Sequence, residues 1–253
     1  GSTAVGRLLM RQGADSIKNI SLELGGNAPF IVFESTDLEK AVDGVMACKF
    51  RNAGQTCISA NRIYVQDSIY DDFADRLSTR ISALAVGPGM QDGVQIGPLI
   101  NSAAIEKVQD HVRDALEKGA TLVCGGTVHE AGPLFFAPTM LTDMTTEMLV
   151  RHEETFGPVA GLFRFSGEEE AVRAANDTIY GLAAYFYSRD LGQCFRVAEA
   201  LEYGMVGVND PVISAESVPF GGIKQSGLGR EGAKDGIEAF TEVKYTLMGG
   251  LSG

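Results

Sequence analysis

Residues 28–33 read Ala28-Pro-Phe-Ile-Val-Phe33, a continuous apolar run in the first part of the chain. A strand that is buried on both faces, as in a parallel sheet, has this kind of composition. Thr36 and Glu39 then have the spacing of a helix capping box, and apolar side chains recur at helical spacing from Leu38 to Phe50. Residues 61–65 carry the next strand pattern. The stretch therefore predicts a strand, a helix and a second strand in succession.

The alternation of strands and helices continues along the rest of the chain. Further strands are expected at 17–24, 122–124, 159–165, 185–187, 205–208 and 243–248, and an extended segment is expected at 135–141. Helices are expected at 3–12, 69–84 and 105–115, after the cap residues Ser166 and Asp190, and at 231–240. This order is typical of the α/β class, with a mainly parallel sheet covered by helices on both faces.

Composition and charge limit the kinds of partner. The 253 residues are 45% hydrophobic and carry a formal net charge of −12, which leaves room for a sizeable core. Nucleic acids and anionic membranes bind clustered positive charge, so we expect neither as a partner. A small anionic substrate is compatible with this charge if a few cations line its pocket. No apolar run reaches the ~20 residues of a membrane span and no signal peptide is evident, so we expect a cytoplasmic protein.

The cysteines are widely spaced and include no Cys-x-x-Cys pair; they are Cys48, Cys57, Cys124 and Cys194. The histidines do not cluster with them; they are His111, His129 and His152. Structural zinc sites use these residue types at close spacing. We therefore expect no metal site.

Cys57 stands in the segment Phe50-Arg-Asn-Ala-Gly-Gln-Thr-Cys-Ile-Ser-Ala-Asn61. The pattern predicts that a helix ends just before Gly54 and that a strand begins near Asn61, so the cysteine lies in a loop that can present it to a substrate. A lone cysteine is more often a small buried apolar residue than a nucleophile. This segment alone leaves both interpretations open.

Three glycine-rich segments accompany the cysteine loop: Ser21-Leu-Glu-Leu-Gly-Gly26, Glu153-Glu-Thr-Phe-Gly-Pro158 and Pro219-Phe-Gly-Gly-Ile-Lys-Gln-Ser-Gly227. The spacing Gly-x-Gly-x-x-Gly at 227–232 is not a dinucleotide fingerprint, because no strand leads into it. In this order the four segments resemble the aldehyde dehydrogenase superfamily. The resemblance covers essentially all 253 residues and is strongest to the bacterial succinate-semialdehyde dehydrogenases.

The resemblance implies a catalytic pair, Cys57 and Glu23. Cys57 would attack an aldehyde as the thiolate, and the resulting thiohemiacetal would lose hydride to NADP or NAD and become a thioester. The backbone N–H of Cys57 would stabilise the oxyanion. Glu23 would act as the base for the thiol or for the hydrolytic water. Without the resemblance, Glu23 reads as a carboxylate at a strand end that accepts nearby N–H groups.

The resemblance also implies a cofactor site, formed by Ser2, Leu24, Gly25, Glu154 and Phe156. Glu154 would accept two ribose hydroxyls, and Ser2 would lie near the pyrophosphate at a helix N-terminus. On their own, Glu154 reads as part of a solvated pair before a Gly-Pro turn, and Ser2 reads as a helix cap.

For the substrate, the resemblance implies a small aldehyde with a distal carboxylate, bound by Arg51, Ser214 and Phe220. Arg51 stands six positions before the nucleophile, as in succinate-semialdehyde dehydrogenases, and its guanidinium would grip that carboxylate. Alone it reads as a last-turn arginine beside the helix dipole. Glu231 would relay protons, or be a first-turn glutamate. Glutarate semialdehyde is the alternative substrate.

Members of the superfamily are roughly twice as long as this chain. By analogy, the expected divisions are a remnant of the dinucleotide-binding domain (1–26), a catalytic domain (27–225), a helix returning to the cofactor domain (226–240) and an oligomerisation strand (241–253). We expect a homo-oligomer, a dimer or tetramer. The residues that choose NAD or NADP would lie in the other half, so this chain alone should turn over little.

Two other classes of protein stay open. A cysteine-dependent thioester hydrolase or acyltransferase would use Cys57 with His152 as the base, without a nicotinamide. A non-catalytic module would assemble through the exposed edge of the final strand, and its Cys57 would react as an ordinary thiol.

Overall fold

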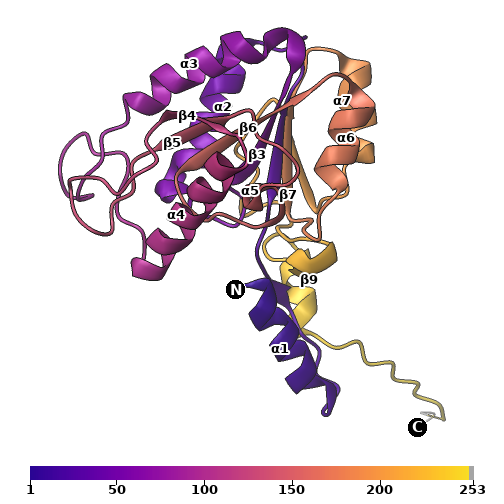
Figure 1. Ribbon diagram of the computed structural model, residues 1–253. Coiled ribbons are helices and arrows are strands. Elements are labelled where there is room, and N and C mark those ends of the chain that lie inside the picture. The colour runs from indigo at the N-terminus through magenta and orange to yellow at the C-terminus, as the bar shows by residue number, and fades with distance from the viewer. Residues whose placement is uncertain (251–253) are drawn as a thin grey trace.

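The apolar run at 28–33 forms β2 (Ala28–Val32), a fully buried strand of the main sheet. The computed structural model describes residues 1–250. Strand β2 lies between β3 (Ala60–Gln66) and β7 (Ala183–Tyr187), and the three strands are parallel. The seven strands follow the order β4-β5-β6-β3-β2-β7-β8, with helices on both sides (Figure 1).

The outer strands of this sheet are β4 (Thr121–Cys124), β5 (Thr139–Thr142), β6 (Val159–Phe165) and β8 (Met205–Val208). The edge pair β4–β5 is antiparallel, and the other described pairs of the sheet are parallel. The predicted α/β fold with a mainly parallel sheet is therefore confirmed.

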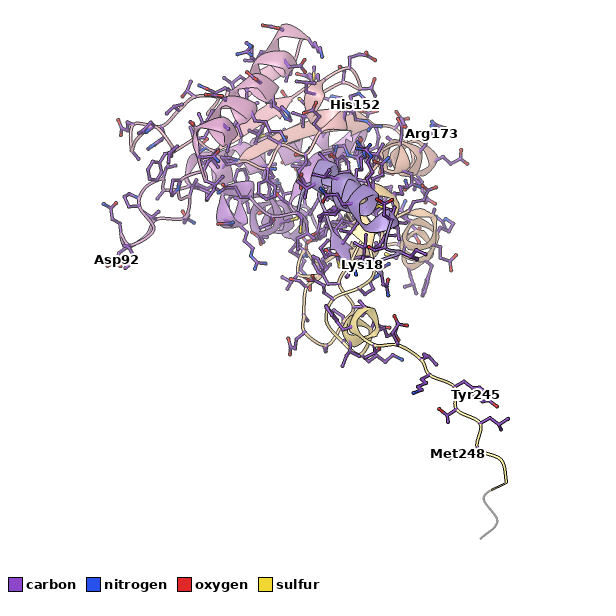
Figure 2. All side chains as sticks on the ribbon, turned by 90° about the horizontal axis from the view of Figure 1, so that it is seen from below. Lys18, Asp92, His152, Arg173, Tyr245 and Met248 are labelled. Carbon is purple, nitrogen blue, oxygen red and sulfur yellow. The ribbon has the colours of Figure 1, made fainter. Side chains whose placement is uncertain are left out.

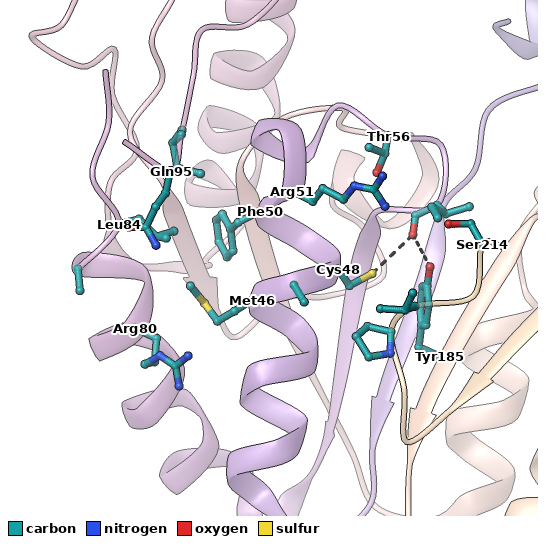
Figure 3. Close-up of a pocket in the computed structure, with 16 residues that line it drawn as sticks. Met46, Cys48, Phe50, Arg51, Thr56, Arg80, Leu84, Gln95, Tyr185 and Ser214 are labelled. Carbon is teal, nitrogen blue, oxygen red and sulfur yellow. Dashed lines mark hydrogen bonds between the residues drawn. The ribbon is translucent and has the colours of Figure 1, made fainter. Parts of the chain in front are cut away.

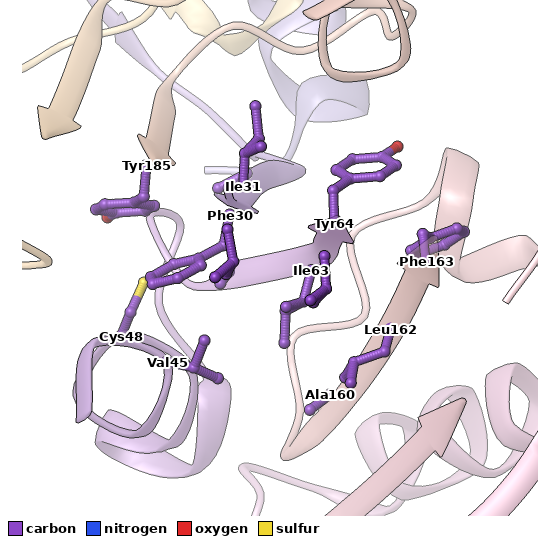
Figure 4. Close-up of a cluster of buried hydrophobic side chains, with 14 of the residues drawn as sticks. Phe30, Ile31, Val45, Cys48, Ile63, Tyr64, Ala160, Leu162, Phe163 and Tyr185 are labelled. Atoms are coloured by element: carbon purple, nitrogen blue, oxygen red, sulfur yellow. The ribbon is translucent and has the colours of Figure 1, made fainter. Parts of the chain in front are cut away.

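Side chains of β2 alternate between the two faces of the sheet. Phe30 stacks on Tyr187, with ring centroids 5.1 Å apart, and faces the helix that carries Val45 and Cys48 (Figure 4). Ile31 points to the opposite face (Figure 4). Full burial of one such side chain contributes about 1.5–3 kcal/mol, so both faces must be covered for the sheet to be stable.

The helices of the main body are α2 (Leu38–Phe50), α3 (Tyr70–Ser82), α4 (Ser102–Glu117), α5 (Leu149–His152), α6 (Glu168–Asn176) and α7 (Leu191–Ala200). Helix α2 packs against α3 and β3, whereas α6 packs against α7 and α7 against β8. Short 3₁₀ helices are η1 (Arg51–Gly54), η2 (Asp67–Ile69), η3 (Lys224–Ser226) and η4 (Asp235–Phe240). Within residues 1–250, none of the helices is both long and apolar enough to span a bilayer.

Two of the three predicted helix caps are wrong. The N-cap of α2 is Asp37, which accepts the backbone N–H of Lys40 at 3.4 Å, so the helix begins one residue later than a Thr36–Glu39 box requires. The N-cap of α6 is Gly167 and not Ser166. The backbone N–H and the hydroxyl of Ser166 both donate to the carboxylate of Glu170, so this hydroxyl acts as a donor and not as the acceptor of a helix cap. The third cap is confirmed: Asp190 accepts the N–H of Gln193 at 3.0 Å.

A smaller unit lies below the main sheet in Figure 1 and contains α1 (Thr3–Ala14), β1 (Leu22–Glu23) and β9 (Gly227–Leu228). Strands β1 and β9 pair antiparallel, and the Thr3 hydroxyl donates to the Gln225 carbonyl at 3.1 Å. The strand expected at 17–24 is limited to Leu22 and Glu23. Within the described residues, these two are the part of 17–24 that pairs with a neighbouring strand, β9. The N-terminal segment and residues 225–228 therefore meet beside Glu23.

The C-terminal expectations at 231–240 and 243–248 need correction. The helix is the 3₁₀ helix η4, which begins late because Gly232 and Ala233 have positive φ angles of 69° and 47°. Residues 243–248 pair with no described strand and are exposed (Figure 2), since a strand requires a hydrogen-bonding neighbour. Assembly through this segment stays a prediction, and 251–253 lie outside the described residues.

Candidate active site

The loop that carries Cys57 begins with a left-handed turn. The sequence predicts a helix up to Gly54, but α2 ends at Phe50 and the next three residues after Arg51 have positive φ angles: 51° for Asn52, 55° for Ala53 and 74° for Gly54. Left-handed backbone costs about 1–2 kcal/mol per non-glycine residue. A Cβ atom at Gly54 would lie 2.2 Å from the carbonyl oxygen of Gly157. The turn therefore needs glycine there, and it redirects the chain toward Cys57.

Hydrogen bonds on both sides of Cys57 hold the loop. The backbone N–H of Ser59 donates to the Thr56 carbonyl at 3.1 Å. The hydroxyl of Tyr185, from β7, donates to the carbonyl of Ile58 at 2.8 Å (Figure 3). The Cys57 backbone is therefore tied to the core of the sheet, which restricts where the thiol can lie.

Gly26 packs directly on this loop. A Cβ atom at position 26 would lie 2.3 Å from the carbonyl oxygen of Cys57, which is closer than any non-bonded contact allows. The crowded atom belongs to the backbone, so a side chain at position 26 displaces the loop. The absence of a side chain at Gly26 therefore sets the position of the Cys57 loop.

We expect Gly26→Ala to destabilise the protein by about 1–3 kcal/mol, as overpacking of a core does, and to lower the alkylation rate of Cys57. Thermal unfolding and iodoacetamide labelling measure the two effects. Gly97→Ala is the control, because nothing lies within 4 Å of a Cβ atom there. Equal behaviour of the two variants would contradict the proposed role of Gly26.

Cys57 and Glu23 line one cavity of about 810 Å³, here called the thiol cavity. The other predicted site residues that line it are Ser2, Leu24, Gly25, Glu154, Phe156, Phe220 and Glu231. These residues come from the N-terminal segment, the 153–156 segment and the C-terminal loop. The structure thus brings the predicted catalytic and cofactor residues together, whereas their roles stay predictions.

Glu23 lies at the end of β1 with both carboxylate oxygens buried and without a hydrogen-bond partner among the described residues. Burial is the main cause that raises its pKa to about 7, and the charge of Glu231 raises it further. The charge of Arg230 lowers this pKa, and so does the nearby backbone N–H of Gly222, although that N–H does not reach hydrogen-bond geometry. A carboxylate with this pKa is a suitable general base near neutral pH. The simpler interpretation, a carboxylate satisfied by backbone N–H groups, does not fit this geometry.

The Cys57 thiol is disfavoured as a thiolate by its surroundings. Burial raises its pKa, and the charges of Glu154 and Glu23 raise it further, whereas its own backbone N–H lowers it. The thiol is therefore mainly protonated at neutral pH. Attack on a substrate needs a proton acceptor or a cation close to the sulfur.

Glu154 is held by the same glycine-rich segment. Its Oε1 accepts the backbone N–H of Gly26 at 3.0 Å, and a Cβ atom at Gly25 would lie 2.8 Å from its Oε2. Burial raises the pKa of Glu154, and the Gly26 N–H and the charges of Lys107 and Lys49 lower it. Glu154 is therefore a fixed acceptor in the cavity and is not part of a solvated pair.

Ser2 and Glu231 reach the thiol cavity from opposite ends of the chain. Ser2 is the N-cap of α1 and accepts the N–H of Val5 at 3.3 Å, so the simple capping interpretation also holds. Glu231 is placed by two backbone hydrogen bonds with Phe220, of 2.7 and 2.8 Å. It lies before η4 and not within a helix, so it is not a first-turn glutamate.

A second cavity of about 520 Å³, here called the arginine cavity, contains Arg51 and Ser214 (Figure 3). In that view the guanidinium of Arg51 extends toward Thr56 and Ser214. Thr56, next to Cys57, lines both cavities. Phe220, predicted to bind the substrate with Arg51, lines the thiol cavity instead. The chain bends back there to pair with Glu231, which sequence spacing does not indicate.

His152 lies outside both cavities as described for residues 1–250. It is exposed at the end of α5 (Figure 2), and its Nε2 donates to the carbonyl of Thr146 at 2.7 Å. A base for a cysteine hydrolase must reach the thiol directly or through one water. The geometry therefore removes the base that a hydrolase mechanism with His152 requires.

A family model described as the aldehyde dehydrogenase family matches residues 1–246. The chain belongs to this family. The aldehyde dehydrogenase resemblance of the sequence is thereby confirmed.

Similar proteins cover nearly all of this aldehyde dehydrogenase chain. The NADP-dependent succinate-semialdehyde dehydrogenase GabD of Escherichia coli (strain K12) is 60% identical over 249 residues, 98% of this chain and 52% of that protein. A 3-sulfolactaldehyde dehydrogenase of Pseudomonas putida is 59% identical over 251 residues, 99% of this chain and 52% of that protein. The crystal structure of an E. coli NADP-dependent enzyme matches with a TM-score of 0.96 at 60% identity, over 97% of this chain and 51% of that one. The chain spans about half the length of these relatives.

Some residues that line the thiol cavity of this aldehyde dehydrogenase chain were not predicted from the sequence. Lys107, on the exposed side of α4, lines it and lowers the pKa of Glu154. Gln55 donates from its side chain to Asn52 O and Pro98 O, at 3.2 and 3.3 Å. A lysine on the polar face of an amphipathic helix reads as solvated, so no local signal marks Lys107.

Proposed function

We propose that the full-length protein containing this chain oxidises succinate semialdehyde to succinate, with NADP or NAD as the electron acceptor. The observation that carries the proposal is the pair of adjoining cavities. Cys57 and Glu23 line one, Arg51 and Ser214 line the other, and Thr56 lines both. The proposed nucleophile, the proposed base and the proposed site for a distal anion would therefore surround a single loop.

The arginine cavity would bind the substrate carboxylate. Arg51 offers a planar guanidinium that binds a carboxylate through two parallel hydrogen bonds, and the Ser214 hydroxyl adds a third donor. An aldehyde anchored there at its far end would extend past Thr56 toward the Cys57 sulfur. Fixing both ends of a short substrate accounts for a large part of the rate, because it removes rotational freedom before the reaction.

Cys57 would form the covalent intermediate. Its thiolate adds to the carbonyl carbon, which forms a C–S bond and places negative charge on the former carbonyl oxygen, beside the backbone N–H of Cys57. A nicotinamide cofactor, when bound in the thiol cavity, supplies the acceptor for the hydride whose loss converts this adduct into a thioester. Because burial raises the pKa of the thiol, its proton must pass to an acceptor before attack, either Glu23 or a water molecule.

Glu23 would release the product. Its carboxylate, with a pKa of about 7, can take a proton from a water molecule. The resulting hydroxide adds to the thioester carbon, the C–S bond breaks, and the acid leaves with Cys57 restored as the thiolate. Glu231, whose charge acts on Glu23 in the same cavity, would pass the proton outward.

The residues of the thiol cavity fit a nicotinamide dinucleotide. Glu154 presents a fixed acceptor for ribose hydroxyls, and Gly25 leaves room beside its Oε2. Ser2 stands at the N-terminus of the 12-residue helix α1, where backbone N–H groups favour phosphate. Leu24 and Phe156 add apolar surface for the ring. The name of the E. coli relative makes NADP the first cofactor to test.

We expect Arg51→Ala to raise the KM for succinate semialdehyde by about 10²-fold, since a charge-assisted hydrogen bond contributes about 1.5–3 kcal/mol and each 1.4 kcal/mol is tenfold. The KM for butanal, which lacks the carboxylate, should change less than about twofold. Steady-state kinetics of the full-length protein measure both values.

Arg80→Ala is the matched control, because Arg80 lines the far end of the same cavity (Figure 3) and pairs with Asp43 at 2.8 Å. If Arg51→Ala raises the KM for succinate semialdehyde no more than Arg80→Ala does, the substrate assignment fails. Glutarate semialdehyde and 3-sulfolactaldehyde belong in the same assay, since a guanidinium also binds a sulfonate and one relative is named for that substrate.

A further inference from the structure

The side-chain carboxamide of Asn61 forms hydrogen bonds with the two residues that flank Glu154 in the sequence, Glu153 and Thr155. Its Nδ2 donates to the carbonyl of Glu153 at 2.9 Å. Its Oδ1 accepts the backbone N–H of Thr155 at 3.1 Å. One side chain therefore holds the residue before and the residue after Glu154, which fixes the backbone from which that carboxylate projects.

The same carboxamide also binds the glycine segment. Nδ2 of Asn61 donates to Oδ1 of Asn27 at 2.9 Å and to the Val150 carbonyl at 2.9 Å. The two hydrogens on Asn61 Nδ2 thus serve three acceptors, counting the Glu153 carbonyl, so one hydrogen is shared between two acceptors. Asn27 directly follows Gly26, whose N–H donates to Glu154. The glycine segment and the 153–155 segment are therefore joined through one amide group.

Asn61 stands in β3, four residues after Cys57. The three polar residues of this cluster, Asn27, Asn61 and Thr155, are between 1% and 3% exposed. The guanidinium of Arg62 extends this cluster by donating to the Asn27 carbonyl at 2.8 and 3.1 Å. A buried polar cluster whose groups are satisfied is rigid and costly to disturb. The strand that follows the nucleophile is thereby locked to both segments that hold Glu154.

We propose that Asn61 is a positioning residue for the cofactor: it sets the distance between Glu154 and Cys57 and so determines how tightly the nicotinamide ribose is held. This inference rests on the proposed function, because it assumes that a nicotinamide cofactor occupies the thiol cavity. Asn61 itself touches neither cavity within the described chain. Its effect must therefore pass through the backbone of 153–155.

Asn176 provides a matched control. Its carboxamide makes the same kind of bracket, donating to the Ala200 carbonyl at 2.8 Å and accepting the Glu202 N–H at 2.9 Å. It lies at the end of α6, and it lines neither of the two cavities described here. Loss of this bracket removes two hydrogen bonds of the same kind from the fold without acting on Glu154.

The experiment is a fluorescence titration of NADPH, and of NADH, into full-length wild type, Asn61→Ala, Asn61→Ser and Asn176→Ala, with thermal unfolding of each. We expect Asn61→Ala to bind at least about tenfold more weakly than wild type. Asn61→Ser, which keeps one neutral hydroxyl, should fall between them, and Asn176→Ala should bind as wild type does. Kinetics should show the same split, with a raised cofactor KM and an aldehyde KM within about twofold.

The outcomes separate the two proposals. If wild type binds neither NADPH nor NADH, the proposed function fails, and this inference fails with it. If wild type binds and the folded Asn61 variants bind equally well, the inference alone fails. If Asn61→Ala does not fold, Asn61→Ser decides. A loss of affinity in Asn176→Ala that matches the Asn61 variants would also overturn it, because the effect would then be general destabilisation.

Discussion

Replacing Cys57 with alanine in the full-length protein is expected to reduce the rate of aldehyde oxidation by at least about 10⁴-fold, because removing a nucleophile removes the whole covalent route. The variant should still bind the cofactor, since the residues proposed to hold it are unchanged. The rise of nicotinamide absorbance with succinate semialdehyde measures the rate, and a binding titration measures the cofactor affinity.

Cys194→Ala is the control for this experiment, because Cys194 lies on α7 and lines neither cavity of the described chain. Iodoacetamide adds an independent test. A catalytic Cys57 should be protected from alkylation by bound cofactor, whereas a non-catalytic module predicts an ordinary and unprotected thiol. Turnover that survives in Cys57→Ala would contradict the assignment of the nucleophile.

Glu23→Gln is expected to slow hydrolysis of the thioester by about 10²–10⁴-fold, the range of general base catalysis. The first turnover should still release NADPH, so a burst of up to one equivalent per site should precede a slow steady state. The pH dependence follows from the raised pKa. Because Glu23 titrates near a pKa of about 7, its basic form is gained as pH rises through 7 and lost below it. The wild-type hydrolysis rate should rise over the same interval, and Glu23→Gln should lose this dependence.

The same variant distinguishes two roles for Glu23. Its charge raises the pKa of Cys57, so removing that charge should lower the pKa of the thiol and speed alkylation at pH 7.5. If Glu23 instead served as the base for the thiol, alkylation would slow in Glu23→Gln. Rates of iodoacetamide labelling in wild type and variant separate the two cases, and slower labelling would contradict a role confined to the water.

Much of the fold could be predicted, because each buried parallel strand is marked by its own apolar run. Strands β6 (Val159–Phe165) and β8 (Met205–Val208) have the bounds that the sequence predicts. The predicted strands are wrong where the presence and length of a partner strand determine how many residues pair. Strand β1 is short because β9 reaches it over a few residues, and residues 243–248 have no described partner with which to form a ladder.

The candidate site divides in the same way. The four glycine-rich and cysteine-containing segments could be found because their residue types are unusual in local sequence. Lys107 and Asn61 could not, because a lysine on a helix face and an asparagine at a strand start acquire meaning only when distant segments approach them. The left-handed turn at 52–54 was equally hidden, since Asn52 and Ala53 are not glycines.

The most direct test of the central claim is mass spectrometry of full-length Glu23→Gln after brief incubation with succinate semialdehyde and NADP, followed by acid quenching. We predict a succinyl adduct on the peptide that contains Cys57, in an amount that matches the burst of NADPH. NADPH formation without an acyl group on Cys57, or an adduct on another residue, would contradict the account.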